Sequence, residues 1–342
     1  MRIVMADDGI PFDGSSVETG PLGGAETAFI SLAEALAARG HHVQALSHCT
    51  APLVHNGVAW APIGQEIPDT ADLYIGNRGH RVVGLVPNAR RRVFWLHNPA
   101  QYLRKPRIAW PLARHRQTVV VTGGYHASTI PRWLPCGNVE VIPYGMLDRF
   151  RHASEREPPP PRAIFTSNPL RGLDWLLDLW ASRIAPAVPG AELHVYAGSA
   201  VYAGGPEAKL RLMDEVLERA DALYPQGVRR HVPVGRDALR EVLGRARVML
   251  YRGDPGETFC LSLAEAQAMG VPAVVQPIGS VVERVIDGET GRIADTDDDF
   301  ARAAIAALTN DALWRKWHRA ALSKQRGLSW DEVAARFEAF AA

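Results

Sequence analysis

The sequence has 342 residues, of which 47% are hydrophobic and 22% charged, a composition typical of a soluble globular protein. This length predicts two domains, and a formal net charge of +1 gives no global field that would favour nucleic acid as a partner. The three cysteines are widely scattered, which predicts neither a disulfide framework nor a zinc site and favours a reducing cytoplasm. No window approaches the roughly 18 uninterrupted apolar residues of a transmembrane helix.

The first half of the chain alternates strand-like and helix-like segments. Apolar periodicity predicts a helix at 25–39, between strands at 2–6 and 42–47. A strand, a helix and a second strand form a βαβ unit, whose crossover implies a parallel sheet. Further strands are predicted at 72–76, 93–96, 118–122 and 139–142.

Two features of this half are candidate ligand contacts. Gly23 and Gly24 lie at the entry of the predicted helix, where backbone can approach a ligand closely, although a glycine pair is also ordinary turn punctuation. The surrounding sequence is not G-x-G-x-x-G, so a dinucleotide site is poorly supported. His97 follows a strand, at the edge where open α/β sheets bind ligands, although a histidine there also caps a strand end.

Residues 101–117 interleave basic and aromatic side chains, including Arg107 and Trp110. This pattern suits a phosphate-bearing acceptor or a peripheral contact of 102–116 with the inner face of an anionic membrane. A solvated charged face is the more ordinary interpretation. Pro106 and Pro111 are expected to break any long amphipathic helix.

Four consecutive prolines within 155–162 predict a stiff linker, because a proline run cannot join a sheet. The predicted domains are therefore residues 1–154 and 163–328, with a final helix in 329–342 that returns to the first domain. The second domain repeats the α/β alternation. Asn168 and Arg171 lie in the loop after its first strand, where a guanidinium can fork onto phosphate.

The segment 256–272 is the centre of the predicted site. A loop containing Glu257 leads into a helix containing Glu265, and unpaired N–H groups at such a helix start can bind an anion. Ser262 and Glu265 also fit a capping box, S-x-x-E, which would leave Glu265 a purely structural role. Asp295 and Asp297 form a D-x-D pattern, but they precede a helix and are interpreted as acids at its N-terminus, not as metal ligands.

Five segments, taken together, form a recognisable series. They are residues 23–26 (GGAE), 141–145 (VIPYG), 257–265 (E-x7-E), 270–274 (GVPAV) and 285–291 (VIDGETG). In this order and spacing the chain resembles, over nearly its whole length, the family 4 retaining glycosyltransferases. The resemblance implies the GT-B fold, in which two Rossmann-like α/β domains with parallel sheets face each other across a cleft.

The resemblance also implies roles for individual residues. Glu265 would bind the ribose of a nucleoside-diphosphate sugar, Glu257 would bind the sugar hydroxyls, and Arg171 would bind the diphosphate. Arg171 stands where many members have Lys in an R-x4-K pair, and the first basic residue of that pair is missing. His97 would lie near the donor sugar, and Cys260 replaces a usual Gly. The other implied donor contacts are Gly23, Gly24, Asn168, Leu261 and Ser262, with Val232 and Val234 near the base.

The predicted activity is transfer of a hexose from a nucleoside-diphosphate sugar to an acceptor hydroxyl of a glycan, glycolipid or small molecule, with retention and without a metal or other cofactor. A helix N-terminus and Arg171 can stabilise the charge that builds on the leaving diphosphate. A nucleotide-sugar-binding protein without transferase activity, or a GT-B epimerase or phosphorylase, is the alternative.

Overall fold

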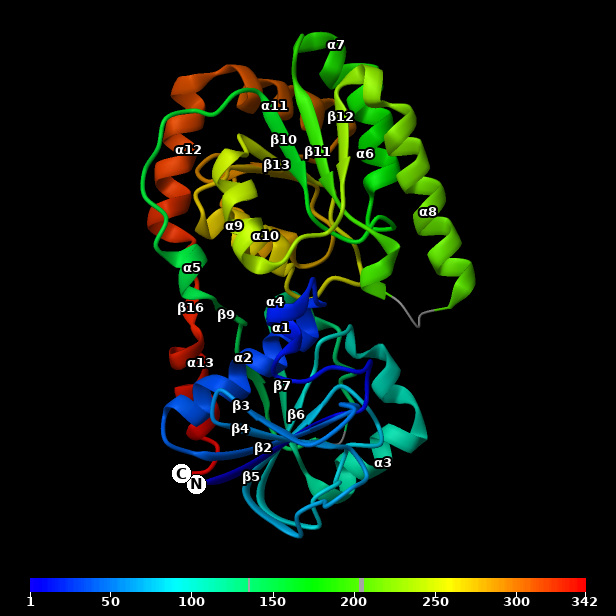
Figure 1. Cartoon of the computed structure of the whole chain (residues 1–342), viewed down its shortest axis with the longest axis vertical. Helices are drawn as coiled ribbons and strands as arrows, with labels where there is room; N and C mark the ends of the chain where they lie inside the picture. The colour runs from blue at the N-terminus through cyan, green and yellow to red at the C-terminus, as the bar shows by residue number, and fades with distance from the viewer. Residues whose placement is uncertain (135, 203–205) are drawn as a thin grey trace. The chain divides into compact units, whose positions relative to one another are not determined.

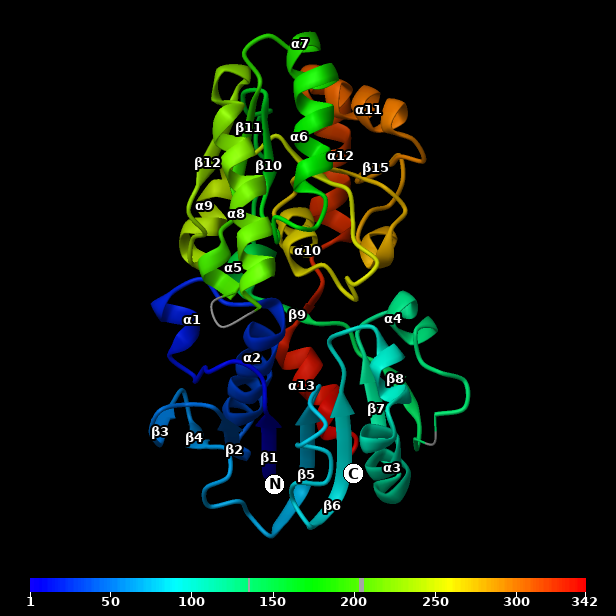
Figure 2. The same cartoon turned by 90° about the vertical axis from the view of Figure 1, so that its right-hand side faces the viewer.

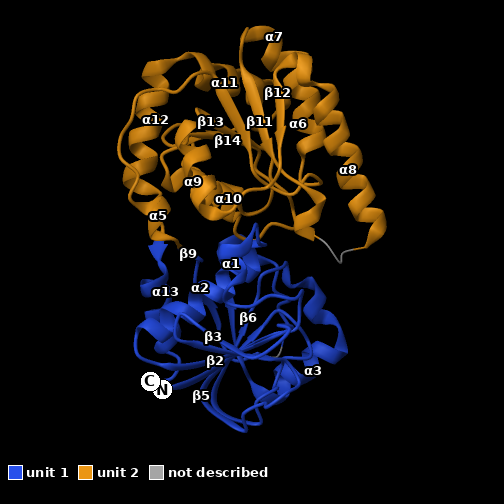
Figure 3. Ribbon diagram, in the orientation of Figure 1, with its two compact units in different colours: residues 1–145, 328–342 blue, residues 146–327 orange. Residues whose placement is uncertain are grey.

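The computed structural model describes residues 1–134, 136–202 and 206–342. The chain forms two compact units, Met1–Gly145 with Leu328–Ala342 and Met146–Gly327, coloured separately in Figure 3. It enters the second unit at Met146, before the proline-rich segment 155–162 at which the sequence places the boundary. The two-residue strands β9 (Gly145–Met146) and β16 (Leu328–Ser329) lie in the sequence where the chain passes between units.

The first unit is built on an eight-stranded sheet with the order β3-β4-β2-β1-β5-β6-β7-β8. Its neighbouring strands are parallel, except that β3 pairs antiparallel with β4 at one edge. The parallel sheet predicted from the βαβ pattern is therefore confirmed, and the edge hairpin was not predicted. The strands are β1 (Arg2–Asp7), β2 (His42–Ser47), β3 (Leu53–His55), β4 (Val58–Pro62), β5 (Thr70–Asn77), β6 (Asn88–Trp95), β7 (Thr118–Val121) and β8 (Val139–Val141).

Helices cover both faces of this sheet. Successive strand residues point to opposite sides, so apolar side chains on each face have to be buried. Phe94 joins a buried cluster with Ile108 on one face, whereas the neighbouring Trp95 contacts Phe337 on the other, with ring centroids 5.2 Å apart. Figure 2 shows β2, β1, β5 and β6 side by side. The helices are α1 (Ser16–Thr19), α2 (Gly24–Ala38), the 3-10 segment η1 (Ala100–Arg104), α3 (Pro106–His115), α4 (Gly124–Ser128) and α13 (Trp330–Glu338).

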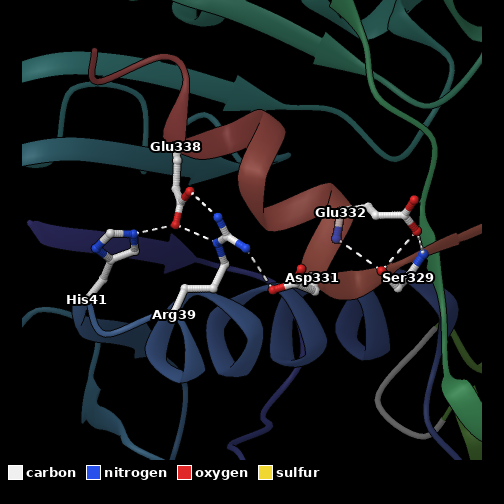
Figure 4. A network of polar contacts seen from close by, with 6 residues as sticks. All are labelled: Arg39, His41, Ser329, Asp331, Glu332 and Glu338. Carbon is white, nitrogen blue, oxygen red and sulfur yellow. Dashed lines mark hydrogen bonds and ion pairs between the residues drawn. The ribbon is translucent and has the colours of Figure 1, made fainter.

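A polar network joins α13 to the end of α2 within the first unit (Figure 4). Arg39 donates to both carboxylate oxygens of Glu338, at 2.6 and 2.8 Å, and to Asp331 at 2.8 Å. His41 also contacts Glu338, at 2.6 Å. The hydrogen bonds from Arg39, followed by that from His41, lower the pKa of Glu338 to about 2. A capping box between Ser329 and Glu332 starts α13.

The second unit contains a six-stranded sheet in which all neighbours are parallel, in the order β12-β11-β10-β13-β14-β15. Counted from β10, this is the order 3-2-1-4-5-6 of doubly wound nucleotide-binding sheets. The winding reverses between β10 and β13, and ligands of such sheets bind beyond the carboxyl ends of the strands at this point. The strands are β10 (Arg162–Phe165), β11 (Glu192–Tyr196), β12 (Val228–His231), β13 (Val248–Tyr251), β14 (Ala273–Val275) and β15 (Gly291–Ile293).

Helices flank the second sheet as well (Figure 1). They are α5 (Asp148–Arg151), α6 (Leu173–Leu179), α7 (Ala185–Ala187), α8 (Glu207–Ala222), α9 (Arg236–Arg245), α10 (Leu261–Ala268), α11 (Asp297–Thr309) and α12 (Asp311–Lys324). In the described part of the chain, no helix combines the length and apolar character needed to cross a membrane.

Candidate functional site

The loop from β13 into α10 has a left-handed residue at its end. Cys260 precedes the first helical residue, Leu261, and has φ 63° and ψ 70°. This conformation is sterically costly for a residue with a Cβ, so glycine is its natural occupant. The backbone thus explains why the resembling family usually has Gly at this position.

The capping-box interpretation of Ser262 and Glu265 is wrong. The helix begins at Leu261, so both residues lie inside it, and Cys260 makes no side-chain capping hydrogen bond. The Ser262 hydroxyl lies 3.8 Å from the Cys260 thiol. Glu265 therefore has no role in closing the helix start, and its environment has to be explained by other contacts.

Glu257 is held between the ends of the two strands where the winding reverses. Its Oε1 accepts from Nη1 of Arg171 at 2.6 Å, in the loop after β10. Its Oε2 accepts from the hydroxyl of Tyr251, the last residue of β13. Burial, followed by electrostatic interactions with Cys260 and Glu257, raises the pKa of Tyr251 well above its usual value, so the phenol keeps the proton that it donates.

Glu265 is almost fully buried, with 2% of its side-chain surface exposed, and forms an ion pair with Arg236. Burial raises the pKa of Glu265, although Arg236 opposes this shift. Within the described residues, the second carboxylate oxygen, Oε2, is buried and has no hydrogen-bond partner. A buried acceptor without a donor costs free energy, so a ligand hydroxyl that reached Oε2 would relieve that cost.

Arg236 links Glu265 to the segment predicted to lie near the base. It is the first residue of α9 and follows Val232 and Val234 by a few positions. Val232 is 77% exposed and Val234 is partly buried. Asn168, in the neighbouring β10 loop, uses its side-chain oxygen to accept from Leu170 N–H at 2.9 Å, so it shapes the loop that carries Arg171.

In the first unit, His97 belongs to a buried chain of hydrogen bonds. Its Nε2 contacts the side-chain oxygen of Asn77, and the Asn77 amide nitrogen donates to Asp7. Because the carboxylate fixes the Asn77 amide orientation, His97 carries its proton on Nε2, and Nδ1 accepts from the hydroxyl of Tyr144. Burial, followed by the charge of Arg78, lowers the pKa of His97 well below its usual value, so the ring is neutral near pH 7.

Gly23 caps α2, Gly24 is its first residue, and the Glu26 carboxylate lies against Gly23. A Cβ on Gly23 would stand 2.2 Å from Oε2 of Glu26. Glu26 is paired in turn with Arg78 at 2.7 Å, and Arg78 also contacts Asp7 at 3.1 Å. The glycine therefore leaves room for an ion-pair cluster at the carboxyl ends of β1 and β5.

Residues 101–117 form no long helix, as expected, but only Pro106 marks a helix boundary. Pro106 is the first residue of α3, where its missing N–H costs nothing, and Pro111 lies inside the helix without ending it. Ile108 and Leu112 are buried, whereas Trp110 is 72% exposed. The segment is thus a short amphipathic helix with an aromatic side chain on its outer face.

The interpretation of the D-x-D pattern as a helix start is confirmed. Thr296 caps α11 by accepting from the Asp299 N–H at 3.1 Å, and Asp297 lies in the first turn. The carboxylate of Asp297 accepts from Trp175 at 3.1 Å and from Gln276 at 2.9 Å. Throughout the part of the chain that the structure describes, no group of three or more His, Cys, Asp and Glu side chains is placed to hold a metal ion.

The sequence did not predict four of the residues that hold these groups: Asn77, Tyr144, Arg236 and Tyr251. Asn77 and Tyr251 are the last residues of β5 and β13, so polar residues at strand ends were a usable signal. Arg236 had no comparable signal, because only the tertiary fold brings α9 to α10.

Comparison with known proteins identifies a family for most of the second unit. Residues 161–310 match the family model described as glycosyl transferases group 1. This match places residues 161–310 in the group 1 glycosyltransferase family. The predicted resemblance to family 4 is thereby confirmed, and the matched range contains Arg171, Arg236, Glu257 and Glu265.

Curated proteins similar to this chain are named as glycosyltransferases. A D-inositol 3-phosphate glycosyltransferase of Streptomyces avermitilis is 29% identical over 217 residues, which cover 58% of this chain and 45% of that protein. One of Nocardioides sp. is 39% identical over 80 residues, 23% of this chain and 18% of that protein. The chain spans less than half the length of these curated relatives.

The predicted GT-B fold is confirmed by solved structures over the full chain. The sucrose-phosphate synthase of Thermosynechococcus elongatus has a TM-score of 0.75 at 16% identity and covers 99% of this chain and 98% of its own. Anabaena HepE, solved in complex with UDP and glucose, has a TM-score of 0.73 at 13% identity, with the same coverage of both chains. At these identities the likeness shows the fold alone.

Proposed function

We propose that this protein is a retaining glycosyltransferase that moves a hexose from a nucleoside-diphosphate sugar to an acceptor hydroxyl, without a metal ion. The observation that carries the proposal is the pairing of both acids of the E-x7-E segment with arginines from other loops. Glu257 with Arg171, and Glu265 with Arg236, supply hydroxyl acceptors and guanidinium donors within one α/β unit. A sugar, a diphosphate and a ribose need such groups in that combination.

Each group in the second unit has a proposed task. The free oxygen of Glu265, Oε2, accepts from a ribose hydroxyl, and Arg171 turns from Glu257 to the diphosphate. Glu257, still held by Tyr251, then accepts from the hydroxyls of the donor sugar. Leu261 and Ser262, at the uncapped start of α10, offer N–H groups to the diphosphate, and Val232 and Val234 flank the base.

The chemistry follows from where charge develops. When the bond between the sugar and the diphosphate breaks, negative charge builds on the leaving group, and Arg171 with the α10 N-terminus stabilises it. The acceptor hydroxyl attacks from the face on which the diphosphate departs and gives its proton to the leaving phosphate, so the configuration is retained. Glu257 orients the sugar in this scheme and forms no covalent bond to it.

The first unit is proposed to bind the acceptor at the carboxyl edge of its sheet. His97 has both ring nitrogens engaged, by Asn77 and Tyr144, so it contacts a sugar only after one of these bonds opens. The predicted donor contacts of His97, Gly23 and Gly24 stay predictions. Since the curated relatives are named for D-inositol 3-phosphate and HepE was solved with UDP and glucose, a UDP-hexose and D-inositol 3-phosphate are the first pair to assay.

A thermal-shift screen tests the donor part of the proposal. A nucleoside diphosphate present at 100 times its Kd adds about 2.7 kcal/mol of stability, which raises Tm by about 5 °C. The screen compares UDP, GDP and ADP with their monophosphates, in the native protein, in Glu265→Gln and in the control Glu241→Gln at an exposed position of α9. The proposal requires a diphosphate shift that Glu265→Gln abolishes and Glu241→Gln keeps, and it fails if no diphosphate raises Tm.

A further inference from the structure

One stretch of the first unit is rich in basic residues and contains no acidic residue, and within it Arg78 pairs with acids from elsewhere in the unit. Although the whole chain has a net charge of only +1, the sequence between Asp72 and Glu140 contains eleven Lys and Arg residues and no Asp or Glu. They are Arg78, Arg81, Arg90, Arg91, Arg92, Arg104, Lys105, Arg107, Arg114, Arg116 and Arg132. Such a bias creates a local field of one sign that the summed charge conceals.

The fold concentrates part of this charge around one pocket of about 250 Å³, several times the volume of about 30 Å³ that a water molecule occupies in the liquid. Arg90 and Arg91, near the start of β6, line it together with His115 and Arg116 at the end of α3. The remaining lining residues are Arg92, Thr118 and Phe340.

The arginines of the pocket differ in what already binds them. Arg92 donates to backbone carbonyls, including Ala89 O at 2.9 Å and Val86 O at 3.1 Å, so it is a structural residue. Arg90, Arg91 and Arg116 are exposed and make no ion pair with any residue in 1–134, 136–202 or 206–342. Their guanidinium groups remain available to a ligand.

Two further observations separate this pocket from an ordinary solvated face. Arg116 has φ 43° and ψ 46°, a left-handed conformation that is unfavourable for a residue with a side chain and is usually taken by Gly or Asn at a helix end. Burial, followed by the charges of Arg92 and Arg114, lowers the pKa of His115, as expected where positive charge is not compensated. Like charges held together are unfavourable until an anion joins them.

We propose that this pocket binds a phosphate group, through Arg90, Arg91 and Arg116. Guanidinium groups match the geometry of phosphate oxygens by two parallel hydrogen bonds, and these three arginines line the pocket from two separate segments of the chain. The phosphate belongs either to a soluble phosphate compound or to the headgroup of a membrane lipid, and the exposed Trp110 on α3 would suit the second source.

The pocket is distinct from the edge of the sheet where His97 lies, and it does not rest on the proposed transferase function. Arg91 is in the amino-terminal half of β6, and His97 follows the carboxyl end of the strand. They are six positions apart in an almost fully extended segment, or about 20 Å at about 3.3 Å per residue. A phosphate in the pocket is therefore neither the donor diphosphate nor a group on the reacting acceptor hydroxyl.

The test compares two double variants that remove the same charge. Arg91→Ala with Arg116→Ala alters the pocket, whereas Arg81→Ala with Arg132→Ala removes two exposed arginines of the same acid-free stretch outside it. All are measured in an Arg171→Met background, so that the second unit contributes less to the signal. Inorganic pyrophosphate is titrated calorimetrically, and vesicles of phosphatidylcholine with and without phosphatidic acid are used in co-sedimentation.

The proposal expects the pocket variant to weaken binding by about tenfold or more, and the control variant to change it by less than about twofold. If pyrophosphate shows this difference and vesicles do not, the source is a soluble phosphate compound; if the acid-containing vesicles show it, the source is a lipid headgroup. Equal losses in both double variants, or no binding of either probe by the parent protein, would overturn the proposal.

Discussion

The ion pair between Arg236 and Glu265 gives the sharpest test of the site, because both side chains are largely buried. Arg236→Met removes the charge, keeps much of the side-chain volume and leaves the Glu265 carboxylate without its counter-charge. Removing one partner of a buried pair costs about 3–5 kcal/mol. The variant should lose stability of that order at pH 7.5, measured by urea unfolding.

The loss should depend on pH with a definite sign. Burial already raises the pKa of Glu265 above its usual value, and Arg236 limits the rise, so the variant raises it further. A protonated Glu265 is favoured in the folded state, so stability of the variant rises as pH falls from 7.5 towards 5 relative to the native protein. The destabilisation should therefore be smaller at pH 5 than at pH 7.5.

Two control variants test whether the loss of stability comes from the unpaired Glu265 carboxylate. Arg240→Met makes the same change at an exposed position of the same helix and should cost little. Adding Glu265→Gln to Arg236→Met removes the unpaired charge and should restore part of the stability and abolish the pH dependence. The reasoning is refuted if Arg236→Met is no more harmful than Arg240→Met, or if its cost is the same at both pH values.

Three further predictions concern single residues. Arg171→Met should lower kcat about 100- to 1000-fold, because the leaving diphosphate loses stabilisation, and Arg171→Lys should recover part of it. A kcat of Arg171→Met within about threefold of the native value would exclude this role. The ring of His97 should stay neutral between pH 6.5 and 8, because its pKa is lowered, and a ring NMR signal, assigned with His97→Gln, that titrated near 6.5 would contradict the network. Glu338→Gln should lower the free energy of unfolding above pH 4.5. Because Arg39 and His41 hold the pKa of Glu338 near 2, the difference from the native protein should shrink as pH falls towards 2. Denaturation curves whose difference does not change with pH would refute this.

The sequence predicted the architecture because local patterns determine it. Apolar runs and helical periodicity placed most strands of both sheets, since each depends on residues that are neighbours in the chain. The edge hairpin β3–β4 was missed although Asn56 and Gly57, which join its strands with positive φ, are typical of a two-residue hairpin turn. Pro111 was expected to interrupt a long helix, but it lies inside the ten-residue α3, whose burial of Ile108 and Leu112 outweighs one missing backbone hydrogen bond.

The site could be predicted only in part. Glu257, Glu265 and Arg171 follow from motif and strand-end position, but nothing local shows which charge neutralises which. The capping box failed for a related reason: S-x-x-E would make Ser262 the N-cap of a helix that begins at Leu263, whereas Cys260 is the N-cap and the helix begins at Leu261. The contacts of Arg236 and Tyr144 became known only from the structure, because their partners, Glu265 and His97, lie 29 and 47 positions away in the sequence.

The most direct test of the account is the product formed from an α-linked UDP-hexose and an acceptor alcohol. Proton NMR of the native protein's product should show an α-linkage, and Glu257→Gln and Glu265→Gln should each reduce its formation, whereas Glu241→Gln should not. A β-linked product, a covalent adduct of the sugar with Glu257, or unchanged turnover in both motif variants would contradict the account.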